Sequence, residues 1–334
     1  MITRNDLFAT LLDPEHVDRA VRRCTRGKAT RPDIAWFLFR REQRLALLCD
    51  QLHHGTWRPA GFRRLYLRDP KPRVIARASV EDRVVHSLVA LALEPVVLRS
   101  ASEADYACRL GFGQHRAVLA LLRLLRRHRF ALHLDIRSYF PSIDPDRVRR
   151  QLDRCTRDRR LLELVERILA SGRGLYDSPR ARQHARMDPG WPPRGRGLPM
   201  GAVTSQLFAA HVYLQAFDHF VKRRLRVPGY VRYVDDMFLF GDRVSELRAW
   251  RAAIEEYLGD ELALRLKHPD APVLDCRDQL DGLGMRIRRD RIEPLPKAWR
   301  RFRGRAGDAV WSGRETPERV RAGVAAAAGH LLFG

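Results

Sequence analysis

Apolar residues recur at helical spacing in the first part of the chain. Leu45, Leu48 and Leu52 follow one another at intervals of three and four, and the pattern ends at Gly55. Because such positions lie on one face of a helix, we expect a helical N-terminal extension over residues 1–55. The same kind of spacing predicts further helices over residues 80–98, 117–128 and 204–226.

Other segments have the patterns of strands and loops. In residues 131–137 the side chains at 132, 134 and 136 are apolar, and Asp135 lies on the opposite face near the end of the expected strand. Residues 62–75 predict two short strands joined by a turn at Asp69-Pro70. Residues 171–197 are rich in Gly, Pro and Arg, and we expect a mobile basic loop there.

The segment GYVRYVDDMFLFG, residues 229–241, predicts a tight hairpin with Asp235 and Asp236 at its tip. Aspartate is a common turn residue, so the pair also has an ordinary structural explanation. However, two like charges between apolar strands repel each other unless a cation lies close to both. Metal binding is therefore the better explanation of the pair.

Asp135 would add a third carboxylate if its strand lies beside the hairpin in one sheet. Two Mg²⁺ ions about 3.5–4 Å apart can hold the attacking and leaving oxygens of a phosphoryl transfer. Mg²⁺ needs few carboxylates, because water and phosphate oxygens complete its coordination. Judged on spacing by itself, a set of unrelated surface aspartates is an equally good explanation.

The chain is strongly basic, with 63 basic and 40 acidic residues, a net charge of +23, and only five lysines. This charge favours a polyanionic partner such as nucleic acid, although a genome that prefers arginine codons would explain part of the excess. No apolar run reaches the roughly 18 residues of a membrane span. Asp6 and Asp13 stand where a signal peptide would need its apolar stretch. We therefore expect a cytoplasmic protein without a membrane partner.

Five blocks of sequence resemble those of the reverse transcriptases, in the order in which that family carries them. Tyr233-Val234-Asp235-Asp236 is similar to the family's YxDD box. The other blocks are KPRVIARASVEDRVVH (71–86), LDIRSYFPSID (134–144), GLPMGAVTSQLFAAHVY (197–213) and LGMRI (283–287). The resemblance spans roughly residues 60 to 290. It implies an α+β fold of the right-hand polymerase type, with fingers, a palm of antiparallel sheet packed on helices, and a short helical thumb.

The resemblance also implies roles for the acidic residues and for one aromatic residue. Asp135 and Asp235 would ligate two Mg²⁺ ions, for which Mn²⁺ could substitute, with Asp236 beside them. Phe140 stands where the family keeps a steric gate against the ribose 2′-hydroxyl, which would select deoxynucleoside triphosphates (dNTPs). An ordinary core phenylalanine is the alternative for Phe140.

Four further residues are implied in the dNTP site. Lys71 and Arg73 would contact the triphosphate, since cationic groups suit phosphate oxygens, whereas a solvated strand edge is the alternative. Gly201 would let the backbone approach the nucleotide, or it is a plain glycine at the start of a helix. Gln206 belongs to the same implied site.

Position 200 departs from the pattern of many family members. They carry Pro-Gln-Gly where this chain has Pro199-Met200-Gly201. Together with Thr204-Ser205-Gln206, an apolar residue here resembles the reverse transcriptases of diversity-generating retroelements, which have an aliphatic residue at this place and make errors at template adenines. The resemblance implies that Met200 belongs to the dNTP site, where its apolar side chain replaces an amide that would touch the nucleotide, and this replacement would loosen base-pair selection. Plain packing of Met200 is the alternative, and Met is not the usual aliphatic residue of this subgroup.

We expect three parts: the extension over 1–55, fingers and palm over 56–293, and a short thumb over 294–334. The resemblance implies an RNA template, a DNA or RNA primer, and dNTPs as partners. The small thumb and the charge of +23 also predict an accessory protein or a structured non-coding RNA as a partner.

The leading interpretation is an RNA-directed DNA polymerase, a nucleotidyltransferase, acting as the mutagenic enzyme of a diversity-generating retroelement. One alternative is a stand-alone bacterial reverse transcriptase used in antiphage defence. Others are a catalytically silent RNA-binding palm protein, which would not need three aspartates, and an RNA-dependent RNA polymerase. Phe140 disfavours the last, because an RNA polymerase needs room for the 2′-hydroxyl.

Overall fold

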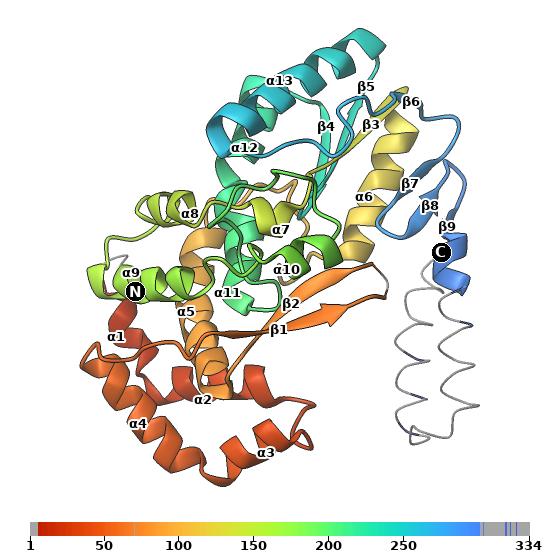
Figure 1. Ribbon diagram of the computed structural model, residues 1–334. Coiled ribbons are helices and arrows are strands. Elements are labelled where there is room, and N and C mark those ends of the chain that lie inside the picture. Colours follow the sequence, from red (N-terminus) through yellow and green to blue (C-terminus); the bar gives the residue numbers. More distant parts are fainter. Residues whose placement is uncertain are drawn as a thin grey trace. The chain divides into compact units, whose positions relative to one another are not determined.

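The computed structural model describes residues 6–69 and 71–300 and the single residues 303, 318, 321 and 325 (Figure 1). The chain forms two compact units. The first comprises residues 1–102, 136–218 and 257–265, and the second comprises residues 103–135, 219–256 and 266–334. Within the described part of the chain, none of the helices has the length and apolar character needed to span a membrane.

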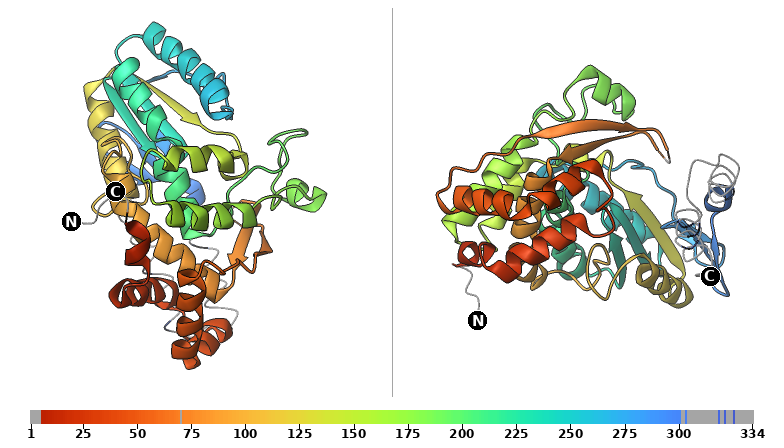
Figure 2. Two further views of the ribbon diagram at one scale, coloured as in Figure 1. Left: turned by 90° about the vertical axis from the view of Figure 1, so that its left-hand side faces the viewer. Right: turned by 90° about the horizontal axis from the view of Figure 1, so that it is seen from below.

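The first unit is mostly helical, and α5 (Val80–Leu98) packs against several of its other helices. In Figure 2 the N-terminal helices, drawn in red and orange, gather around one end of α5. Its other helical elements are α1 (Leu7–Leu11), α2 (Pro14–Thr25), α3 (Pro32–Phe39), α4 (Arg41–His53), α7 (Tyr139–Ser142), α8 (Pro145–Leu152), α9 (Arg159–Ser171), α10 (Pro179–His184), α11 (Val203–Leu207), η1 (Phe208–Tyr213) and most of α12 (Gln215–His219).

Local sequence explains where several of these helices begin. Asp13 and Asp144 each accept hydrogen bonds from backbone N–H groups of the first turn, and each is followed by a proline. Ser79 caps α5 in the same way by accepting from the Asp82 backbone N–H. These side chains satisfy N–H groups that have no partner inside the helix. The predicted helix over 80–98 is confirmed.

The predicted pair of short strands is also confirmed. β1 (Phe62–Leu67) and β2 (Arg73–Ala78) form an antiparallel hairpin in which Phe62 lies opposite Ala78. Pro70 of the connecting turn lies outside the described residues.

Residues 171–197 are not the mobile loop that their composition predicts. They contain α10, and Tyr176 and Ala181 are buried in a cluster with Val74 and Ala76 of β2. Arg182 donates hydrogen bonds to two backbone carbonyls within the same segment. The few apolar residues of this segment pack on a strand far away in the sequence, and their irregular spacing gives no periodic signal.

The helix predicted over 204–226 is helical but irregular, because two stretches of π-helix, η1 and η2 (Phe220–Arg224), interrupt it. A π-helical turn changes the hydrogen-bond partner by one residue and leaves the apolar spacing nearly the same. The spacing therefore predicts the helix without its interruptions.

The second unit is built on a four-stranded antiparallel sheet with the order β4-β5-β3-β6. A smaller sheet has the order β7-β8-β9. The elements are α6 (Gln114–Arg127), β3 (Phe130–Asp135), η2, β4 (Gly229–Tyr233), β5 (Asp236–Gly241), β6 (Leu274–Asp275), β7 (Leu280–Gly282), β8 (Met285–Ile287) and β9 (Ile292–Pro294), with α13 (Val244–Leu262) running from this unit into the first.

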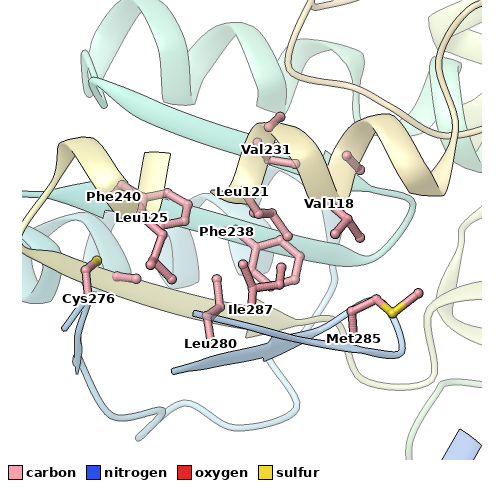
Figure 3. Close-up of a cluster of buried hydrophobic side chains, with 13 residues drawn as sticks. Val118, Leu121, Leu125, Val231, Phe238, Phe240, Cys276, Leu280, Met285 and Ile287 are labelled. Atoms are coloured by element: carbon pink, nitrogen blue, oxygen red, sulfur yellow. The ribbon is translucent and has the colours of Figure 1, made fainter. Parts of the chain in front are cut away.

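The core of the second unit lies between α6 and the sheets (Figure 3). Leu121 and Leu125 of α6 point toward Phe238 and Phe240 of β5, and Ile287 of β8 closes the cluster from the smaller sheet. All five side chains are fully or almost fully buried. This apolar packing fixes the central strands, which carry the candidate site at their ends.

The predicted three-domain division stays a prediction. The two units do not divide at residues 55/56 or 293/294. Most of the predicted thumb, residues 294–334, lies outside the described residues.

Candidate active site

The sheet of the second unit brings two of the three aspartates directly opposite each other. β3 and β5 are antiparallel, and Asp135, the last residue of β3, pairs with Asp236, the first residue of β5. Residues opposite each other in such a pair have Cα atoms only about 4.5–5.5 Å apart. Val234 and Asp235 form the two-residue turn before Asp236. The prediction that both aspartates lie at the tip is therefore wrong for Asp236, which begins β5.

The turn itself has an unusual backbone. Val234 precedes Asp235 and has a φ of 58°. This left-handed conformation is unfavourable for a β-branched side chain, and such residues cost on the order of 1–3 kcal/mol. The surrounding structure must therefore hold the turn in place.

Electrostatics at the turn are also unfavourable without a cation. Asp235 is half-buried. Loss of hydration raises the pKa of Asp235 to about 7, and the negative charges of Asp135 and Asp236 contribute to the increase. The positive charge of Lys267 acts in the opposite direction. A divalent cation between these carboxylates would stabilise their charged forms.

Two partners of the carboxylates were not predicted from the sequence. Lys267 donates a hydrogen bond from its ammonium group to Asp135, and its backbone N–H donates to the Asp135 carbonyl at 2.8 Å. His133 Nε2 lies 2.8 Å from Asp236 Oδ1, and the His133 ring stacks on Phe238. His133 lies two residues before Asp135, on the same face of the strand, so the sequence alone could have placed His133 near the carboxylates. Lys267 is 132 residues from Asp135 and offered none.

The donor set has the chemistry that Mg²⁺ prefers, because it consists of carboxylate oxygens of like charge on facing positions. Among the described residues, no group of three His, Cys, Asp or Glu side chains is placed so that it could hold a metal ion. Asp135 and Asp236 instead contact Lys267 and His133. Lys267 binds Oδ2 of Asp135 and His133 contacts Oδ1 of Asp236, so each carboxylate keeps a second oxygen for a metal ion.

The residues predicted to bind dNTP belong to the first unit. The Met200 backbone is held at both ends: its N–H donates to the Tyr176 hydroxyl at 3.1 Å, and its carbonyl accepts from the Ala76 N–H at 2.8 Å. The Phe140 carbonyl accepts from the Leu198 N–H at 2.9 Å. The segments that carry Phe140 and Met200 are thus hydrogen-bonded to neighbouring backbone within one unit.

The remaining predicted dNTP residues are solvent-accessible. Arg73 begins β2, the strand whose Ala76 binds the Met200 carbonyl, and Lys71 precedes that strand. Both basic side chains are exposed, as is Gln206 on α11. Their exposure is compatible with ligand binding, and their roles stay predictions.

We expect Gly201→Ala to destabilise the protein by about 1–3 kcal/mol. Gly201 has a φ of +113°, and an added Cβ would lie 3.0 Å from the Ala76 carbonyl oxygen and from a methyl carbon of Ile75. Gly259→Ala is the matched control, since nothing lies within 4 Å of an added Cβ there. Alanine in that helix should stabilise by about 0.5–1 kcal/mol. Urea unfolding of both variants measures the difference, and equal stability would contradict a close approach at Gly201.

Comparisons with known proteins give one family match. A family model described as reverse transcriptase (RNA-dependent DNA polymerase) matches residues 68–268. This segment includes Asp135 and the Asp235-Asp236 pair, and four of the five sequence blocks described above. No curated protein matches the chain in sequence.

Several solved structures are similar in fold. Apo telomerase from Candida tropicalis matches with a TM-score of 0.51 and 9% identity, over 76% of this chain and 53% of that chain. Telomerase from Candida albicans, in complex with a fragment of telomeric RNA, gives 0.49 and 13%, over 76% and 49%. A partial Cas6-RT-Cas1–Cas2 complex gives 0.40 and 16%, over 76% and 43%. The chain thus spans about half the length of the telomerase chains, and at these identities the likeness concerns the fold.

Proposed function

The chain belongs to the reverse transcriptase family of RNA-dependent DNA polymerases, and from this premise we infer that it synthesises DNA on an RNA template. Its mixed helical and antiparallel architecture is that of the right-hand polymerases, as the sequence predicted. The observation that carries the proposal is the placement of Asp135 opposite Asp236, with Asp235 in the adjoining turn.

The proposed reaction joins a primer 3′-hydroxyl to the α-phosphate of a dNTP and releases pyrophosphate. Divalent metal ions serve reverse transcriptases in general, and we propose two Mg²⁺ ions held by Asp135 and Asp235, with Asp236 beside them. When bound there, the ions would supply charge neutralisation for the attacking and leaving oxygens. The stacked ring of His133 holds Asp236, and the central sheet fixes the spacing of the carboxylates.

We propose that Lys71, Arg73 and Gln206 contact the nucleotide. Gly201, which has no side chain, would let the protein backbone come close to the nucleotide. The exposed cationic side chains of Lys71 and Arg73 support this role, because a triphosphate is strongly anionic. The RNA template and primer are proposed as the polyanionic partners that the net charge of +23 predicts. We also propose an accessory protein or a structured non-coding RNA as a further partner.

Phe140→Ala is expected to raise the incorporation of ribonucleotides at least tenfold relative to deoxynucleotides. Phe140 is half-buried and its ring lies edge-on to Tyr139, so its position is defined. Removing the ring would give room to a 2′-hydroxyl. Primer extension with competing nucleotides measures the ratio, with Phe39→Ala, an exposed phenylalanine of the same unit, as the control. An unchanged ratio would remove the gate role from Phe140.

Within the family, we propose the mutagenic enzyme of a diversity-generating retroelement. Met200 supports this assignment: its backbone is held by Tyr176 and Ala76, so an apolar side chain stands at a defined place where many family members have an amide. An apolar group cannot make the hydrogen bonds of a glutamine amide to the nucleotide or its neighbours. Looser selection of the base pair would follow.

Met200→Gln should reduce misincorporation at template adenines severalfold, because it restores the amide. Primer extension on a defined RNA, followed by sequencing of the DNA, tests the activity and the errors together. Met187→Gln makes the same chemical change at another half-buried methionine of the unit and serves as the control. Absence of any DNA product would contradict polymerase activity, and accurate copying of adenines by the unaltered protein would contradict the retroelement assignment.

A further inference from the structure

A completely buried ion pair lies beside the aspartate hairpin in the second unit. Arg232 Nη2 and Asp105 Oδ2 are 2.8 Å apart, and their side chains are 0% and 1% exposed. Arg232 is a residue of β4, two positions before Val234. Asp105 belongs to residues 103–113, which precede α6 and lie outside the five sequence blocks.

Backbone hydrogen bonds join the same two segments. The Arg232 N–H donates to the Ala104 carbonyl at 2.7 Å, and the Tyr106 N–H donates to the Arg232 carbonyl at 2.9 Å. Asp105 thereby forms a parallel bridge with Arg232. Since β4 is the last strand of its sheet, residues 104–106 cover an edge that would otherwise expose unpaired backbone groups.

The second arm of the guanidinium reaches the turn. Arg232 Nη1 donates to the Val234 carbonyl at 3.0 Å. Val234 is the left-handed residue of the turn, and Asp235 follows it directly. One planar group therefore binds Asp105 with one nitrogen and the backbone of the strained turn with another, which a lysine ammonium at the same place could not reproduce.

Asp105 is itself held firmly, so it can serve as an anchor. Its carboxylate also accepts from the Ala107 N–H at 3.2 Å, and its backbone carbonyl accepts from Arg109 at 3.0 Å. A buried ion pair adds little net stability compared with a well-packed apolar pair. Net stability is therefore a weak explanation for the presence of this ion pair. Support of the strained turn at Val234 is a specific explanation.

We propose that Arg232 and Asp105 are positioning residues that hold the Val234-Asp235 turn and thereby set where the Asp235 carboxylate lies. The proposal rests on the proposed function of Asp235 as a metal ligand. It predicts that weakening the guanidinium contact impairs metal use and leaves dNTP use nearly unchanged, because the residues proposed to bind dNTP belong to the first unit.

The test compares Arg232→Lys, which keeps the charge and loses the fork, with Arg286→Lys as the control. Arg286 pairs with Asp281 at 3.0 Å in the same unit, and both side chains are partly exposed. Primer extension is measured over a range of Mg²⁺ concentrations, and Mn²⁺ binding to the protein without nucleic acid is measured by electron paramagnetic resonance. Asp105→Asn, which keeps the shape of the side chain, provides a second variant if Arg232→Lys does not fold.

For Arg232→Lys we expect a rise of at least fivefold in the Mg²⁺ concentration for half-maximal activity, a matching loss of Mn²⁺ affinity, and a dNTP KM within twofold of the unaltered protein. Asp105→Asn should change in the same direction, and Arg286→Lys should not change. Unaltered Mg²⁺ dependence and Mn²⁺ affinity in the folded variants would overturn the positioning role. If the unaltered protein makes no DNA, the proposed function fails instead, and the Mn²⁺ measurement still decides the positioning role.

Discussion

Asp235→Asn is expected to reduce Mg²⁺-dependent DNA synthesis by roughly 10³-fold or more, because charge stabilisation by a metal contributes several kcal/mol to a transition state. The substitution removes a negative charge from the turn that faces Asp135 and Asp236. An amide oxygen is a much weaker ligand for Mg²⁺ than a carboxylate. Primer extension at several Mg²⁺ concentrations measures the loss.

The matched control for this loss of activity is Asp278→Asn, at an exposed aspartate of the same unit. It should leave synthesis unchanged. RNA binding by Asp235→Asn should also be retained, since basic residues throughout the chain carry the attraction to phosphates. Retained synthesis in Asp235→Asn would remove Asp235 from the metal site.

Asp235→Asn should also stabilise the metal-free protein at neutral and alkaline pH. The folded state raises the pKa of Asp235 from 3.8 to about 7. Between these two values the folded state binds the proton more tightly than the unfolded state, so the folded state loses stability as the pH rises from about 4 to about 7. Above the upper value the penalty is complete, and an asparagine does not suffer it.

The size of the stabilisation follows from the shift. A change of about three pKa units corresponds to about 4 kcal/mol. Because Asp235 is only half-buried and water screens part of the interaction, we expect about 2 kcal/mol. Urea unfolding with a metal chelator at pH 4 and at pH 8 measures this, with Asp278→Asn as the control. A difference between Asp235→Asn and the unaltered protein that does not grow with pH would contradict the electrostatic origin.

The loss of activity and the gain of stability together separate catalysis from folding. If Asp235 served only to terminate a turn, its replacement would cost stability and leave metal dependence unchanged. If it serves as a metal ligand, a more stable and less active protein is the expected outcome. Lower stability that accompanies activity is common at sites where like charges are held together for a function.

Local chemistry made part of the fold predictable. The hairpin of β4 and β5, the strand that ends at Asp135 and the helix over 80–98 all follow from the spacing of apolar residues within a few positions. Ser79 marks the start of that helix through a contact with a residue only three positions away. Where structure depends on neighbours in the sequence, the sequence is sufficient.

Long-range packing decided the rest. The segment 171–197 has the composition of a loop, and only burial of Tyr176 and Ala181 against β2 gives it a defined path. The π-helical stretches after α11 are likewise invisible in the apolar spacing. Composition records the average preference of a segment, whereas its contacts depend on residues far along the chain.

The candidate site divides in the same way. By itself, the sequence determined which carboxylates are available, because Asp235 and Asp236 stand in a recognisable hairpin and Asp135 at a strand end. The tertiary structure decided that Asp135 faces Asp236, that Lys267 and His133 hold these carboxylates, and that Arg232 ties the turn to Asp105. Each of these contacts joins separate segments, and their geometry comes from the packing of the sheet, which no local pattern encodes.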